Sequence, residues 1–405
     1  MRYRMQLWNV LFMHISLTLA LLACASAPQR GTVAEPPAAL AQDSVTWPMQ
    51  LSIWPGVDTL DAFNAEAIAC LRRFCAKKLD REAGNDYWDT ASLARFGNID
   101  QELFYAEFDS VGDPKYPPTL LRIGPTEVAD ERLLTVRWAR LNSQGVASDV
   151  RYVFDFLARR TSDGVRLASP IEHRSRGWKT RQVGLTRYVI SPQHVFSPDQ
   201  ADEQRADIER LSRFFGVEPF PITYYSCADP TDLFRLKGYQ VHPLMHVFPT
   251  GGRADDVDNV FCGNDKDIYT HEIVHLYCSK AFGNTTPGFL EEGLATLLGG
   301  SSEHDYSWHR ANLARWLAAH DTIDLSDFAK TTVPFYINEH TSVPYAVGAL
   351  LCERILASAG KDALFALLAG GEDPWPALEP HGITRKNLTE ELRKQLQAAP
   401  PERMP

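Results

Sequence analysis

The chain has 405 residues, of which 44% are hydrophobic and 23% are charged. This composition excludes a disordered chain and leaves room for two or three folded domains. The formal net charge of -10 and the pI near 5.7 argue against general electrostatic binding of nucleic acid, and no long Lys/Arg cluster counters them. We therefore expect no nucleic-acid partner.

The first segment, MRYRMQLWNVLFMHISLTLALLAC, has the layout of a secretory signal peptide. Arg2 and Arg4 form a basic start, and residues 7–23 are mostly apolar. This apolar run is short for a helix that crosses a bilayer. The sequence thus predicts that residues 1–24 are a signal peptide and that the protein is exported.

The end of this segment, Leu21-Leu22-Ala23-Cys24, resembles the lipobox of bacterial lipoproteins. The resemblance implies that Cys24 is lipidated, becomes the first residue of the mature protein and anchors it to a membrane. Residues 25–46 are rich in Pro and Ala, which is typical of a tether between lipid and first domain. We expect a cell-envelope lipoprotein. By the same resemblance, Ala25 rather than Asp after the cysteine implies the outer membrane, on its periplasmic face, if the source is Gram-negative.

Residues 47–180 are predicted to form an N-terminal α+β domain. A helix is predicted over residues 58–79, where apolar residues recur at helical spacing. The segments 119–126, 132–142 and 148–161 then alternate apolar and polar residues, as β-strands do. In element order the region resembles the cone-shaped domains of the nuclear-transport-factor-2 type. We identify no catalytic constellation in it.

Residues 185–396 are predicted to form a second domain, in which a small sheet precedes a helical lobe. Its first elements are strands at 186–191, 221–227 and 259–263 and helices at 197–217 and 229–239. From Lys266 onward the patterns are almost purely helical. The whole chain is thus predicted to be α+β.

One helix of the second domain carries the sequence IYTHEIVHLYC, at residues 268–278. His271 and His275 lie one helical turn apart and can bind one cation together, and Asp265 is predicted to cap the helix. Glu272 is close enough to act on a metal-bound water without binding the metal. This is the metalloprotease interpretation of HExxH. Zinc hydrolases use three protein ligands and one open position, so a third ligand is required.

The third ligand is expected on the next apolar helix, FLEEGLATLLGG, at residues 289–300. The metzincin pattern is excluded, because Cys278 and Ala281 stand where it requires Gly and His. Glu292 and Glu291 are the candidates. Only one of them can face the metal, because adjacent helical positions point about 100° apart.

HExxH followed by FLEEGLA resembles the gluzincins, where the glutamate before Gly-x-Ala is the third zinc ligand. The resemblance implies that Glu292 takes that role. Residues 342–368 resemble the aminopeptidase N and leukotriene hydrolase branch, in which a tyrosine stabilises the oxyanion, and the match implies Tyr345. The resemblance covers residues 260–368, about a quarter of the chain.

Two features depart from this family pattern. The strand before the motif lacks the Gly-x-Met-Glu-Asn sequence that holds a substrate's free amine, so exopeptidase specificity is not implied. Thr296 stands where the thermolysin pattern has an Asp that orients a ligand histidine. A ligating histidine usually donates its second N–H, so we expect its partner elsewhere.

The sequence therefore predicts a zinc metallopeptidase that acts on a peptide or protein substrate. His271, His275 and Glu292 would bind Zn²⁺, Glu272 would be the general base and Tyr345 the oxyanion donor.

The alternative is a non-catalytic binding protein of the cell envelope with a structural or vestigial zinc site. Structural zinc usually has four closed protein ligands, often cysteines, and Cys262 and Cys278 lie near the motif. The six cysteines after Cys24 are open to two interpretations, because an exported protein can keep disulfides but some of these cysteines lie in apolar helical patterns. His242 and His246 are also four residues apart, but their stretch is predicted to be strand or loop. We expect them to be structural or pocket-lining.

Overall fold

The structure is a computed structural model that describes residues 50–80, 86–142, 144–255, 257–283, 285–329, 335–371 and 373–398. The predicted signal peptide, the lipidation site Cys24 and the predicted tether, residues 25–46, lie outside these residues. The described chain is mixed α+β, which confirms the predicted class. Among the described helices, none is long and apolar enough to span a membrane.

The described chain divides into two compact units. Unit 1 comprises the residues up to Leu93, Asn98–Pro170 and Gly238–Pro243, and unit 2 comprises Ala94–Gly97, Ile171–Lys237 and the residues from Leu244 onward. The sequence predicted one boundary between residues 180 and 185. The short return to unit 1 arises because β9 (Tyr239–Val241) pairs with β4 (Ala147–Thr161), a contact between strands far apart in sequence.

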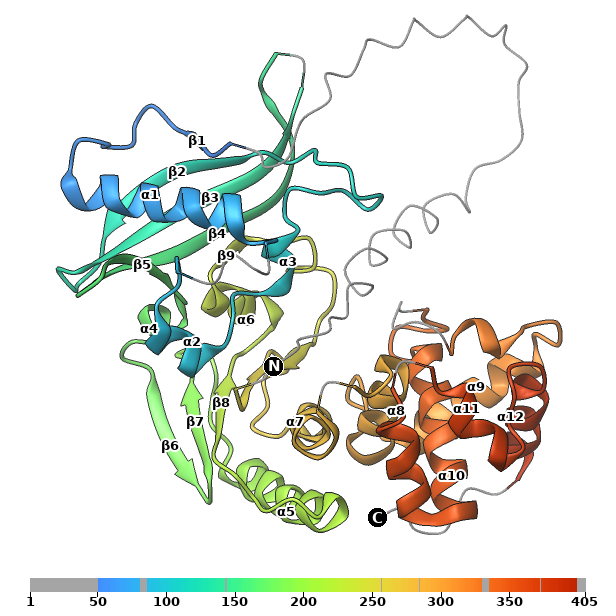
Figure 1. Ribbon diagram of the computed structural model, residues 1–405. Coiled ribbons are helices and arrows are strands. Elements are labelled where there is room, and N and C mark those ends of the chain that lie inside the picture. Colours follow the sequence, from blue (N-terminus) through green and yellow to red (C-terminus); the bar gives the residue numbers. More distant parts are fainter. Residues whose placement is uncertain are drawn as a thin grey trace, which may run out of the picture. The chain divides into compact units, whose positions relative to one another are not determined.

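Unit 1 is a six-stranded sheet with a long helix against it (Figure 1). Its strand order is β1-β2-β3-β4-β5, with β9 on β4. The elements are β1 (Ser52–Ile53), α1 (Ala62–Lys77), α3 (Gln101–Phe104), β2 (Pro118–Pro125), β3 (Glu131–Leu141), β4, β5 (Gly164–Ala168) and β9, while α2 (Thr90–Phe96) runs across the boundary between the units. Asp61 caps α1 by accepting a hydrogen bond from the Asn64 N–H, as expected for a first-turn cap. Within the described residues of unit 1, no three His, Cys, Asp or Glu side chains are grouped to hold a metal ion.

The sheet of unit 2 has the order β10-β11-β8-β7-β6. Its strands are β6 (Lys179–Val183), β7 (Thr186–Ile190), β8 (Ile222–Ser226), β10 (Gly252–Ala254) and β11 (Asn259–Cys262). The central strands β7, β8 and β11 run parallel, and both edge strands are antiparallel to their neighbours. Alternating side chains therefore form two apolar clusters. Tyr188, Tyr224 and Val260 pack in one, and Val189, Tyr225 and Phe261 pack in the other.

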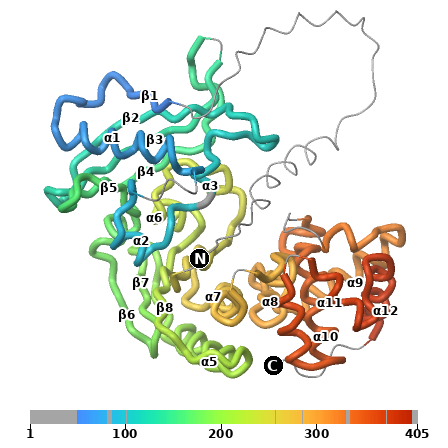
Figure 2. The backbone as a smooth tube through the Cα atoms, viewed as in Figure 1, coloured from blue at the N-terminus to red at the C-terminus, as the bar shows by residue number. Residues whose placement is uncertain are grey.

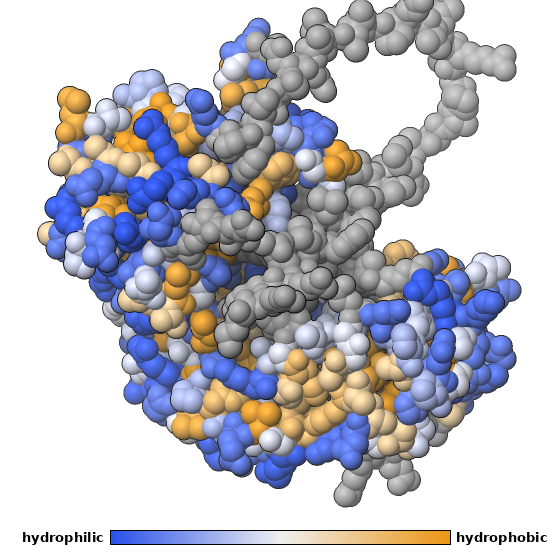
Figure 3. Space-filling model, viewed as in Figure 1, coloured by the Kyte–Doolittle hydropathy of each residue, from blue (hydrophilic) through white to orange (hydrophobic). Residues whose placement is uncertain are grey.

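The helices of unit 2 are α4 (Ile171–Arg174), α5 (Pro198–Phe215), α6 (Pro230–Lys237), α7 (Thr270–Phe282), α8 (Gly288–Gly299), α9 (Tyr306–Ala318), α10 (Val343–Leu368), α11 (Trp375–Leu378) and α12 (Leu388–Gln397). The predicted Ser-Pro start and terminal Gly of α5 are observed as the cap Ser197, a proline in the first turn and a left-handed Gly216. Helix α10 is kinked at Gly360. Helix α12 buries Leu388 and Leu392 and is mostly hydrophilic on the face seen in Figure 3.

The start of α7 is held by α5 rather than by its own cap. The N-cap residue Tyr269 offers no side-chain cap, and its backbone N–H instead donates to Oε1 of Gln204 at 2.6 Å. The hydroxyl of Thr270 donates to Asp207, also on α5. The prediction that Asp265 caps this helix was wrong, because α7 begins only at Thr270 and Asp265 lies in a left-handed turn before it.

Helices α8 and α10 lie side by side (Figure 2), and their closest approach is at Gly293 and Gly348. A Cβ atom on Gly293 would lie 2.2 Å from the backbone carbon of Gly348, and one on Gly348 would lie 2.0 Å from the carbonyl oxygen of Phe289. Only glycine allows so close an approach. Glu292 precedes Gly293, and Tyr345 lies about one turn before Gly348. The crossing therefore brings these two side chains toward each other.

We expect Gly348→Ala to lower the free energy of unfolding by about 1–3 kcal/mol, the usual cost of overpacking. The reason is the collision of the new methyl group with the backbone of α8. Urea unfolding followed by circular dichroism measures the change. Gly251→Ala is the control in the same unit, since a Cβ there meets only Pro230 at 4.0 Å. Equal stability of the two variants would contradict the tight crossing.

Candidate metal centre

Three side chains of unit 2 converge on one point between α7 and α8. Nε2 of His271 lies 3.1 Å from Oε2 of Glu292, and Nε2 of His275 lies 3.5 Å from the same oxygen. One ligand atom from each residue lies within 4.8 Å of the others. The side chain of Glu292 is 22% exposed, so the group is open to solvent. The donor set and its spacing fit a small cation with an open coordination position.

The two adjacent glutamates of α8 have different partners. Glu292 faces the Nε2 atoms of both histidines, whereas Oε1 of Glu291 lies 2.9 Å from Nδ1 of His275. Adjacent residues of a helix point in different directions, which explains this division. The sequence left open which glutamate faces the metal. In this geometry Glu292 is the ligand candidate and Glu291 is the partner of the second nitrogen of His275.

The second nitrogen of His271 is held by the backbone. Nδ1 of His271 lies 2.7 Å from the carbonyl oxygen of Gly300, which follows α8 with a positive φ of 74°. A Cβ atom on Gly299 would lie 2.5 Å from the backbone nitrogen of His271, so a larger residue would separate the two helices. Thr296 replaces the Asp that orients a ligand histidine in the thermolysin pattern, and here the carbonyl group of Gly300 takes over that role for His271. The local sequence gave no means to identify it.

Glu272 is buried beside the histidines and bound to the edge of the sheet. Its Oε2 accepts a hydrogen bond from the backbone N–H of Ala254 at 2.7 Å. Ala254 belongs to β10, and the bonds of its neighbours with β11 show that its own N–H points away from the sheet. Tyr269 packs against Gly252 of the same strand, where a Cβ would lie 2.1 Å from its ring. The carboxylate is therefore fixed in orientation next to His271.

Two tyrosines lie near the carboxylate of Glu292. The ring of Tyr345 stacks on that of His271 with centroids 6.1 Å apart. Burial and the charge of Glu292 raise the pKa of Tyr345, and the same two causes raise the pKa of Tyr336. Sequence matching identified Tyr345 as a candidate and missed Tyr336, which precedes α10 and has no motif around it.

The electrostatics of the group couple its histidines to Glu292. Burial opposes the charged form of His275, but the charges and hydrogen bonds of Glu292 and Glu291 outweigh it and raise the pKa of His275 well above its ordinary value. Burial likewise raises the pKa of Glu292, but His275 and His271 reverse this and hold it low. A divalent cation would take the place of the proton on the histidine, as is usual when a metal binds such ligands.

The cysteines near the motif do not join this group. The candidate metal-binding set contains His271, His275 and Glu292 but neither Cys262 nor Cys278. All six cysteines in the described ranges are buried free thiols. The sequence left open whether these cysteines form disulfides or remain buried thiols, and in the structure they are buried thiols.

The other histidine pair does not converge. Nε2 of His242 lies 2.5 Å from Oε2 of Glu102 within unit 1, while Nδ1 of His246 lies 3.2 Å from the hydroxyl of Thr231 in unit 2. These separate partners agree with the structural role expected from the sequence.

No protein-family model and no curated protein sequence matches the chain. The gluzincin resemblance therefore rests on the residues described above.

A buried polar cluster holds the segment that leads into α7. Asp267 accepts hydrogen bonds from the Ser226 hydroxyl at 2.6 Å and the Ser197 N–H at 2.6 Å. His194 lies between two carboxylates, with Nε2 2.9 Å from Asp267 and Nδ1 2.8 Å from Asp265. The cluster thus joins β8, the start of α5 and the chain before α7.

We expect the stability of the fold to fall as pH rises, because of His194. Burial lowers the pKa of His194, but its bonds to Asp267 and Asp265 outweigh burial and raise it above 6.5. Protonated His194 therefore stabilises the fold fully below the unfolded-state pKa, and this contribution is lost as pH rises through the folded-state pKa. Urea unfolding between about pH 5.5 and 8.5 measures the slope.

The variant His194→Gln should show a weaker dependence on pH over this range. His320→Gln is the matched control, because His320 is exposed at the end of α9. A His194→Gln slope equal to that of the wild type would contradict the assignment.

Proposed function

We propose that this chain is a zinc-dependent peptidase of the gluzincin type. The observation that carries the proposal is the convergence of the Nε2 atoms of His271 and His275 on one oxygen of Glu292. Each histidine also has a partner for its other nitrogen, as zinc-binding histidines usually do. Three such ligands and solvent access suit a catalytic site better than a closed structural one.

The residues around this group suit hydrolysis. Bound by His271, His275 and Glu292, Zn²⁺ would supply Lewis-acid polarisation of a carbonyl group and lower the pKa of a water. Glu272 would take the proton of the attacking water and return it to the leaving amine. The hydroxyl of Tyr345, protonated at neutral pH, would donate a hydrogen bond to the carbonyl oxygen as negative charge develops.

Strand β10 favours a peptide as the substrate. In the described sheet it pairs with β11 on one side only. Glu272 occupies the outward N–H of Ala254, and the other outward backbone groups of β10 are those with which an added strand could pair. Ala254 of this strand already contacts the proposed base, Glu272. A peptide laid along β10 in extended form would pass beside the reacting groups.

The proposal includes the setting inferred from the sequence. Residues 1–24 would be a lipoprotein signal peptide, Cys24 would carry the lipid and residues 25–46 would tether the protein to the cell envelope. The N-terminal region, which resembles the nuclear-transport-factor-2 type in element order, takes no part in this chemistry. The alternative of a closed structural zinc site has less support, because neither Cys262 nor Cys278 belongs to the group of candidate ligands.

Metal content tests the ligand assignment. We expect about one zinc per wild-type chain and none in Glu292→Ala, because that change removes a direct ligand. Glu291→Ala should still bind zinc, with affinity about 10–100-fold lower, because it removes only the partner of His275. Mass spectrometry of metal content and competition with a chelator give both values. Loss of zinc in Glu291→Ala alone would reverse the assignment.

Activity tests the mechanism. We expect Glu272→Gln to keep zinc but to lower peptide cleavage about 10²- to 10⁴-fold, because the amide cannot accept the proton. The amide oxygen can still accept the Ala254 N–H, so the fold should be retained. Digestion of a peptide library followed by mass spectrometry measures cleavage, with Glu209→Gln on the exposed surface of α5 as the control. Undiminished cleavage by Glu272→Gln would contradict the role of Glu272 as general base.

A further inference from the structure

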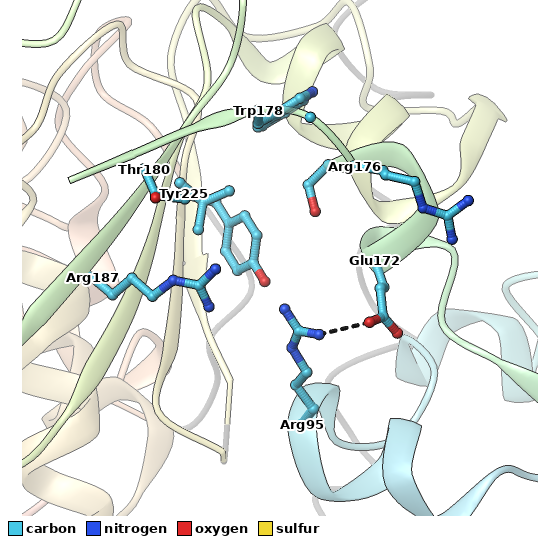
Figure 4. Close-up of a pocket in the computed structure, with 10 residues that line it drawn as sticks. Arg95, Glu172, Arg176, Trp178, Thr180, Arg187 and Tyr225 are labelled. Carbon is cyan, nitrogen blue, oxygen red and sulfur yellow. Dashed lines mark hydrogen bonds and ion pairs between the residues drawn. The ribbon is translucent and has the colours of Figure 1, made fainter. Parts of the chain in front are cut away.

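Unit 2 contains a recess on the face of its sheet opposite α7. This pocket has a volume of about 260 Å³ and lies beside β6, β7 and β8 (Figure 4). Val189 and Tyr225 line it from the strands, and Trp178 lines it from the segment that leads into β6. Three arginines, Arg95, Arg176 and Arg187, also line it.

The sheet separates this pocket from the candidate metal centre. Tyr225 and Val189 belong to the apolar cluster that contains Phe96 and Ile171. Their neighbours Tyr224 and Tyr188 point to the opposite face, where they pack in the cluster that contains residues of α7. The pocket is therefore a separate site, and the zinc proposal does not account for its residues.

The charge around Tyr225 is positive. The guanidinium groups of Arg95 and Arg187 lie beside it in Figure 4, whereas that of Arg176 points away, and the one carboxylate of the lining, Glu172, pairs with Arg95 at 2.9 Å. This is the ion pair drawn in Figure 4, and Arg187 has no carboxylate partner among the lining residues. A guanidinium group carries a fork of donors that matches the oxygens of a carboxylate or phosphate.

Tyr225 adds a neutral donor between two of these cations. Figure 4 shows its hydroxyl directed toward the space between the guanidinium groups of Arg95 and Arg187. Burial raises the pKa of Tyr225 to about 12, although both arginines lower it. The phenol therefore keeps its proton at neutral pH and can donate. Thr180 contributes a further hydroxyl from β6.

The walls suit a flat or apolar group. Trp178 offers an indole ring, and Val189 lines the pocket from β7. A volume of 260 Å³ lies below the range of about 300–1,000 Å³ that is usual for sites of drug-sized ligands. The pocket can therefore hold a single ring or a short acyl group together with one charged head.

We infer that this pocket binds a small organic anion, with a carboxylate or phosphate monoester held by Arg187, Arg95 and Tyr225 and a ring or acyl body against Trp178. Arg187 supplies the principal charge, because Arg95 shares its charge with Glu172. The site is distinct from the proposed peptidase centre and does not depend on it.

Isothermal titration calorimetry of the full chain tests the site with benzoate, phenyl phosphate, inorganic phosphate and the neutral analogue benzamide. We expect benzoate or phenyl phosphate to bind with a Kd below about 1 mM, and benzamide at least about ten-fold more weakly. The stronger of the two aromatic anions identifies the head group. Failure of both anions to saturate by about 10 mM, or equal binding of benzamide, would overturn the inference.

Matched variants locate the binding. Arg187→Gln should weaken the aromatic anion at least about ten-fold, the loss of one charge-assisted contact. Arg181→Gln should change the Kd of the same anion less than about two-fold. Arg181 is also exposed on the neighbouring strand, but it alternates with Thr180 and points to the other face. Equal effects of the two variants would overturn the site.

Two further variants separate the ring contact and the metal centre. Trp178→Leu should weaken benzoate or phenyl phosphate but leave inorganic phosphate unchanged, because only the aromatic ligands reach the indole. Glu292→Ala should leave binding of all the anions unchanged. Loss of binding in Glu292→Ala would assign the anion to the metal centre and overturn the inference, whatever the outcome for peptidase activity.

Discussion

The close crossing of α8 and α10 at Gly293 and Gly348 is the contact on which the geometry of the candidate metal centre depends. The two backbones lie so close there that a side chain on either glycine would collide with the other helix. Glu292 lies beside the first glycine and Tyr345 one turn from the second, so both reach the rings of α7. A local collision here would move a ligand candidate and the proposed oxyanion donor together. The packing of α8 against α10 therefore also sets the positions of Glu292 and Tyr345.

The polar groups of the centre are held because each has a partner. His271 binds a carbonyl group, His275 binds Glu291, and Glu272 accepts a backbone N–H from β10. Leaving such groups buried without partners would cost several kcal/mol, about 1–3 for each. Helix α5 does the same for the start of α7 through Gln204. Each of these side chains thus has a hydrogen-bond partner that sets its orientation.

The sheet of unit 2 separates two environments of different chemistry. On one face, the aromatic residues of β7 and β8 pack toward the helices that carry the histidines and the glutamates. On the other, the alternate residues of those strands line a small cationic pocket. The period of two along a strand makes this division unavoidable, since each neighbour must face the opposite side. One short run, Ile222–Ser226, thus contributes to both.

Helical spacing by itself determined that His271 and His275 share a face, and local pattern determined the start and end of α5. These features depend on residues within a few positions of each other. Local pattern failed at Asp265, because the capping partners of α7 come from α5. It also could not choose between Glu291 and Glu292, find the Gly300 carbonyl group or predict that β9 joins the sheet of unit 1. Each of these depends on contacts between segments far apart in sequence, and only the tertiary structure decides which segments meet.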